Sequence, residues 1–72
     1  MSTVRLRTQA GPVEMPAVTT TAYAAKRVAE AMGWDPHQSW LLAHRGQLLD
    51  PDALVADLDG EMVLLIGSYG RR

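Results

Sequence analysis

Hydrophobic and polar residues alternate near the N-terminus in two short stretches separated by turn-forming residues. Residues 3–8 place Val4 and Leu6 on one side and arginines on the other, which is the period-two pattern of a half-buried strand. The same alternation resumes over residues 13–17, so the two stretches predict an N-terminal β-hairpin. Pro16 lies in the second strand and cannot donate a ladder hydrogen bond. We therefore expect this strand at the edge of a sheet.

A helix-forming segment follows the hairpin, from Ala22 to Met32. It comes after three threonines that suit an N-cap, and Gly33 behind it is the residue type that favours helix C-termini. Spacings of three and four residues put one apolar set on a single face, and its members are Ala25, Val28, Ala29 and Met32. Because alanine side chains are small, we expect the helix to lie close against a sheet.

The second half of the chain contains short apolar segments separated by turns. Residues 39–43 and 47–49 predict another hairpin around Arg45-Gly46, and residues 52–58 predict one helical or 3₁₀ turn. Residues 62–66 are apolar at every position, which predicts a strand in the middle of the sheet, covered at least partly on both faces.

This order of elements predicts an α+β domain over residues 1–67, with one helix packed across a mixed sheet of four or five strands, and a flexible tail over residues 68–72. The expected core residues are Val4, Leu6, Val13, Met15, Val28, Met32, Leu41, Leu54 and Leu65.

Residues 36–54 (PHQSWLLAHRGQLLDPDAL) resemble a segment of ubiquitin and its relatives. The shared features are a proline, polar residues, two apolar strand residues, a Gly/basic turn, a leucine, an acidic turn, and a leucine that fills the core. The similarity covers nearly the whole chain. It implies the ubiquitin-like β-grasp fold, in which the first strand lies parallel to the last. The usage of Ala, Arg and Gly favours a bacterial source, and hence a bacterial ubiquitin-like protein.

The resemblance also implies a recognition surface for other proteins. In the family, an exposed apolar cluster on the outer sheet face binds partners, and alignment of the strands puts Leu42 and Ile66 at two of its positions. We expect Trp40 or His44 at its margin. By alternation Trp40 and Leu42 face outward, and tryptophan is enriched in binding hot spots. The alternative is that Trp40 covers a sheet edge, while Trp34 is expected to close the core.

The C-terminal residues bear on a second function of the family. Its protein modifiers end in Gly-Gly, whereas Arg71-Arg72 stand at those positions here, after Gly70. The resemblance implies conjugation through the Gly70 carboxylate only after a protease removes the last residues, with activating and conjugating enzymes as partners. The alternatives are a non-conjugated adaptor, a regulatory subunit of an enzyme or secretion complex, or a fragment of a longer protein.

Composition narrows the function classes. The chain has no cysteine, which excludes disulfides and thiolate chemistry, and a net charge of -1 gives no general attraction to nucleic acid. No apolar run approaches the roughly 20 residues of a membrane span.

His37 and His44 lack the spacing of a catalytic triad or metal site, and the acidic residues of 50–61 lack the ligand pattern of a calcium loop. We expect exposed, non-catalytic histidines, no cofactor, and a monomeric cytoplasmic protein that is not an enzyme.

Overall fold

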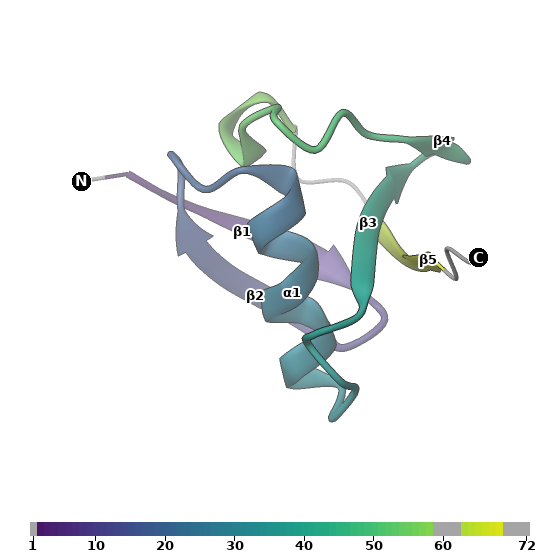
Figure 1. The fold of residues 1–72 in the computed structure, drawn as a ribbon. Helices are drawn as coiled ribbons and strands as arrows, with labels where there is room; N and C mark the ends of the chain where they lie inside the picture. Colours follow the sequence, from purple (N-terminus) through teal and green to yellow (C-terminus); the bar gives the residue numbers. More distant parts are fainter. Residues whose placement is uncertain (1, 59–62, 69–72) are drawn as a thin grey trace.

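The computed structural model describes residues 2–58 and the backbone of residues 63–68 of this 72-residue chain. One helix lies against two small antiparallel sheets (Figure 1). In the first sheet β1 pairs with β2, and in the second β3 lies between β4 and β5. The elements are β1 (Thr3–Thr8), β2 (Gly11–Pro16), α1 (Thr21–Ala31), β3 (Ser39–His44), β4 (Gln47–Leu48), the 3₁₀ helix η1 (Val55–Asp57) and β5 (Val63–Ser68).

The predicted N-terminal hairpin is confirmed, and its register explains how it accommodates two prolines. Thr3 lies opposite Pro16, and the Ala17 amide donates to the Ser2 carbonyl at 3.0 Å. Hydrogen-bonded and non-hydrogen-bonded pairs alternate from there, so Pro12 and Pro16 both occupy non-hydrogen-bonded positions. At those positions a backbone nitrogen points away from β1. The prolines therefore lose no ladder bond within the hairpin.

The predicted helix is also confirmed, shifted by one residue toward the N-terminus. Thr20 is its N-cap, with the side-chain hydroxyl accepting from the Tyr23 amide at 3.3 Å. At the other end Gly33 has φ +78, and the Trp34 amide donates to the Ala29 carbonyl, as in a Schellman cap. The buried side chains recur at three- and four-residue spacing and are Thr21, Ala24, Ala25, Val28 and Ala29.

A tight turn joins β3 to β4 at Arg45 and Gly46, as predicted. Both residues have positive φ, 56 and 82 respectively, which is the backbone of a type I′ hairpin turn. His44 lies opposite Gln47 across this turn, and the Leu49 amide donates to the Leu42 carbonyl at 2.9 Å. The turn therefore places Leu49 beside Leu42.

Gly46→Ala is expected to lower the free energy of unfolding by about 1 kcal/mol, because a Cβ disfavours left-handed backbone. Apart from Gly46 itself and its two chain neighbours, no residue has an atom within 4 Å of that Cβ, so the effect isolates backbone conformation from packing. Urea denaturation measures the difference. Gly46→Asn is the matched control and should cost less, since asparagine tolerates positive φ. Equal stability of Gly46→Ala and the parent would contradict the turn assignment.

The sheet arrangement differs from the single mixed sheet that was expected, and β5 lies at the side of its sheet, not in the middle as predicted. Among the strands that the structure describes, every ladder is antiparallel, and β1 and β5 contact each other without forming a ladder. The helix packs across the inner faces of the hairpin β1–β2 and the β4–β3–β5 sheet, lying in front of both in Figure 1, and the two sheets contact each other through β1 and β5.

The core lies between α1 and the inner faces of the strands. Its buried members are Leu6, Met15, Ala24, Ala25, Val28, Ala29, Leu42 and Val55. Leu6, Met15 and Val28 were predicted, while Val4, Val13 and Met32 pack against this core while partly exposed. Leu65 lies in the part of β5 for which only the backbone is described.

Two core predictions are wrong by one residue. Leu41 is only half-buried, and the fully buried residues of β3 are the two that follow it, Leu42 and Ala43. Leu54 is 40% exposed, while the following Val55 is fully buried. Successive residues of extended chain point to opposite sides, so a shift of one position reverses which side chain is buried.

Candidate protein-interaction surface

Leu42, one of the two central residues of the predicted recognition face, does not lie on the surface. Leu42 is 1% exposed and belongs to the core, so the expectation that it faces outward is wrong. Its partner across the sheet is Leu65, whereas Ile66 lies opposite Leu41. Leu42 and Ile66 therefore occupy register positions on opposite faces of the sheet, and the Ile66 side chain lies outside the described residues.

The Trp40 side chain is held by contacts within the domain and is not freely exposed for binding. It packs against the core, and its indole N–H donates to the Asp35 carbonyl at 2.7 Å. Its ring stacks on Trp34 with centroids 5.1 Å apart. Trp34 is 40% exposed and lies outside the core, so it does not close the core as expected. The stacked indoles stabilise the loop between α1 and β3.

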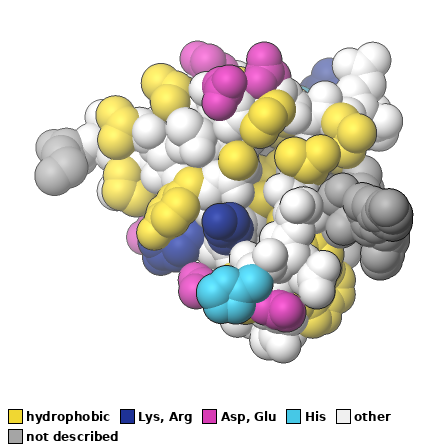
Figure 2. All heavy atoms as spheres, viewed as in Figure 1, with side chains coloured by type: hydrophobic (Ala, Val, Ile, Leu, Met, Phe, Trp, Pro, Cys, Tyr) yellow, Lys and Arg dark blue, Asp and Glu magenta, His cyan; other side chains and the backbone are white. Residues whose placement is uncertain are grey.

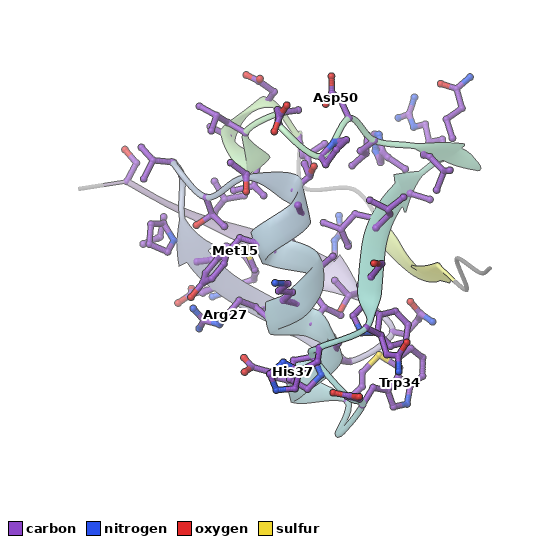
Figure 3. All side chains as sticks on the ribbon, viewed as in Figure 1. Met15, Arg27, Trp34, His37 and Asp50 are labelled. Carbon is purple, nitrogen blue, oxygen red and sulfur yellow. The ribbon has the colours of Figure 1, made fainter. Side chains whose placement is uncertain are left out.

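The remaining predicted residues lie apart from each other. His37 is exposed, as expected, and Figure 3 places it near the C-terminal end of α1. His44, at the end of β3, is half-buried and not exposed as predicted. Gly70, the predicted conjugation residue, lies outside the described residues. Conjugation through it stays a prediction from the sequence.

A different group of large apolar side chains is exposed near the start of α1. Val18 is 76% exposed, Tyr23 is 55% exposed and Leu54 is 40% exposed. We call these three residues the Tyr23 surface. Large apolar side chains exposed together on a small domain are typical of binding sites, although one such side chain alone is not.

The backbone brings the Tyr23 surface together across 36 positions of sequence, counted from Val18 to Leu54. Thr20 and Leu54 form an antiparallel bridge, held by bonds from the Thr21 amide to Ala53 and from the Val55 amide to Thr19, at 2.8 and 2.9 Å. In this bond pattern Thr20 and Leu54 are a non-hydrogen-bonded pair, whose side chains lie closest. Thr19, Thr21 and Val55 are buried on the opposite side.

The same bridge places the other two members. Tyr23 follows in the first turn of α1, where its amide is capped by Thr20, and Val18 precedes Thr20 by two residues. Leu54 thus lies against the segment that carries both. The Tyr23 surface depends on the docking of residues 53–55 onto the start of the helix.

Charged side chains of opposite sign flank the Tyr23 surface. Asp50, Asp52 and Asp57 are all exposed in the segment that carries Leu54, while Lys26 and Arg27 are exposed on α1, one turn beyond Tyr23. Figure 2 shows acidic side chains grouped at the top of this view, hydrophobic atoms exposed below them, and then a group of basic side chains with further acidic side chains beside and below it. In Figure 3, Asp50 lies above the start of α1 and Arg27 projects from lower on the helix.

The Tyr23 surface could not be found from the sequence because its residues come together only through tertiary contacts. Tyr23 falls on the polar side of the predicted helix, where an aromatic residue was a usable signal. Leu54 was assigned to the core, and only the bridge with Thr20 shows it outside. Val18 lies between elements, where hydrophobic periodicity gives no direction.

The described residues hold no cavity and no group of three or more potential metal ligands. None of the helices in that part of the chain is long and apolar enough to cross a membrane.

Comparison with known proteins supports the fold. No protein-family model and no curated protein sequence matches this chain. Among solved structures, a designed protein based on ubiquitin is 18% identical with a TM-score of 0.64, covering 97% of this chain and 92% of its own. A computationally designed protein based on the template of human erythrocytic ubiquitin is 22% identical with a TM-score of 0.52, covering 100% and 98%. The chain has a ubiquitin-like fold.

Proposed function

We propose that this protein is a ubiquitin-like domain that acts by binding other proteins through the Tyr23 surface. The observation that carries the proposal is the exposure of Val18, Tyr23 and Leu54, at 76, 55 and 40%, on two segments that the Thr20–Leu54 bridge joins. Burying apolar area of this kind in a complex releases about 25 cal/mol per Å² before the costs of association. Tyrosine also suits the centre of an interface, since it offers large contact area with few rotatable bonds.

The surface is also supported from beneath, which favours binding without rearrangement. Thr21 is buried, and its hydroxyl donates to the Asp50 carbonyl, while the Ala22 amide donates to the Pro51 carbonyl at 3.2 Å. These bonds fix residues 50–55 against the helix start. A preorganised surface loses less conformational entropy on binding.

The proposed use is non-covalent, as an adaptor or a regulatory subunit of a larger complex. A modifier function through Gly70, a bacterial source and a cytoplasmic location stay predictions from the sequence. Partners of the Tyr23 surface need an apolar group at the centre of their contact.

Photo-crosslinking in cells tests the proposal. A photoreactive phenylalanine analogue in place of Tyr23 is expected to give a discrete adduct with another protein, because the Tyr23 side chain is 55% exposed on the proposed surface. Mass spectrometry identifies the adduct. The same analogue in place of Glu14, which is exposed on β2, is the matched control.

The adduct must also depend on the neighbouring apolar residue. Adding Leu54→Asp to the crosslinking variant should remove the adduct while leaving the fold intact, since Leu54 is not in the core. Adducts at Glu14 but none at Tyr23 would contradict the proposal and place the interface on β2.

A further inference from the structure

We infer that the Tyr23 surface pairs with the Tyr23 surface of a second copy of this chain, across a two-fold axis. This inference rests on the surface proposed above as a binding site, and it names one partner for it. The starting point is the order of groups along α1. Exposed acids lie beyond the start of the helix, the apolar residues come next, and two exposed bases follow, with the exposed acid Glu30 one turn further along.

A two-fold axis that lies in the plane of the contact and perpendicular to α1 joins the surface to itself in the antiparallel sense, so each group contacts the group at the other end. Rotation by 180° about an axis near Tyr23, perpendicular to α1, brings the acidic end of one copy to the basic end of the other. Lys26 and Arg27 then face Asp50, Asp52 and Asp57 of the second copy, and the apolar residues meet at the centre. Opposite charges then face each other at both ends of the contact, so the surface is complementary to itself.

The charge order carries this inference, because apolar exposure alone would suit many partners. A surface flanked by a single sign of charge would repel a second copy in every two-fold arrangement. Here the signs differ on either side of the apolar residues. The net charge of -1 also leaves little overall repulsion between copies, and a near-neutral protein associates more readily than a strongly charged one.

The helix geometry gives the charges a matching separation. Tyr23 and Arg27 are four residues apart and lie on one side of α1, about 6 Å along its axis. The acids lie on the other side of Tyr23, on the segment whose Pro51 carbonyl accepts from Ala22. The centre of the surface is therefore near the first turn of the helix.

The contact is small, since three large apolar residues from each copy form its centre. Interfaces of limited area, below about 1,200 Å² in total, belong to transient complexes. We therefore expect a weak dimer that exchanges with monomer, so that a different protein can compete for the same surface.

Sedimentation equilibrium of the purified protein tests the dimer over a wide concentration range. The expected result is a monomer–dimer equilibrium that is weakened at least tenfold by Leu54→Asp and weakened by added salt. Leu48→Asp is the matched control, because Leu48 is 59% exposed but lies on β4, away from the Tyr23 surface. This substitution should leave the equilibrium unchanged. A monomer at every concentration, or an equal loss in the control, would overturn the inference.

A charge-exchange experiment tests the two-fold geometry itself. One variant carries Lys26→Glu and Arg27→Glu, and the other carries Asp52→Lys and Asp57→Lys. Each alone should lose the dimer, because like charges then face each other at both ends. Mixed together they should form a heterodimer, since both ends are again opposite in sign. Failure of the mixture to associate would refute the antiparallel arrangement.

The outcomes separate this inference from the proposed function. If Tyr23 crosslinks to another protein in cells while the purified protein stays monomeric, the dimer is wrong and the binding function stands. If the dimer forms and Tyr23 crosslinks only to a second copy of the chain, the dimer stands and the proposed binding of other proteins is wrong.

Discussion

Val28→Asp is expected to leave the chain unfolded at 25 °C. Val28 is fully buried on the face of α1 that packs on the core, and no described cation lies in that core to pair with a carboxylate. Burying an unpaired polar or charged group costs several kcal/mol. A core of this size supplies roughly 3 to 5 kcal/mol of stability in total. Far-UV circular dichroism should therefore show no cooperative melting transition.

The control for this experiment is Ala31→Asp, which introduces the same side chain into the same helix. Ala31 is exposed, so the carboxylate stays in water and loses at most about 1 kcal/mol to its place near the helix C-terminus. This variant should melt cooperatively. A Val28→Asp protein that melts like the parent would show that the assigned core is wrong.

Leu42→Arg is expected to destabilise the fold by several kcal/mol, whereas the sequence alone predicted a folded variant defective in binding. Leu42 is 1% exposed and packs in the core between α1 and the sheet, so the guanidinium would be buried or the strand displaced. Urea denaturation monitored by tryptophan fluorescence measures the loss, because Trp40 lies two residues away on the same strand.

Leu48→Arg provides the comparison, since it introduces the same side chain into the neighbouring strand. Leu48 is 59% exposed, and this substitution should change stability by no more than about 0.5 kcal/mol. If Leu42→Arg proved as stable as Leu48→Arg, Leu42 would lie on the outer face, as the strand alignment with ubiquitin implied.

The elements with clear periodicity could be predicted from the sequence. In β1 the arginines alternate with Val4 and Leu6, and this period-two pattern admits one choice of inner face. In α1 the alanines and Val28 recur at helical spacing between Thr20 and Gly33, so both ends and the buried face follow from local chemistry.

The face of β3 could not be predicted in the same way. Trp40, Leu41, Leu42 and Ala43 are all apolar, so the strand itself does not state which side is inward. Which residues of β3 face the core depends on the two-residue turn after the strand, because this turn sets Leu49 opposite Leu42. An alignment shifted by one residue reverses every side chain of such a strand. The predicted recognition face failed for this reason.

The candidate surface escaped prediction for a different reason. Val18 lies in a loop, Tyr23 in a helix and Leu54 in an extended segment before η1, and no local pattern connects them. Their proximity depends on the Thr20–Leu54 bridge, a contact between segments distant in sequence. Contacts between distant segments depend on the whole fold and cannot be predicted from local sequence patterns.

The two prolines of β2 bear on how the protein behaves at high concentration. Along the outer edge of β2, the backbone nitrogens that point away from β1 belong to Pro12, Glu14 and Pro16, so Glu14 alone has an N–H to offer there. A strand from another molecule needs a row of such donors to extend the sheet, which is how amyloid fibrils grow. Glu14 also carries a charge, paired with Arg5 at 3.1 Å. Replacing both prolines would restore the row of donors and open this edge to fibril formation.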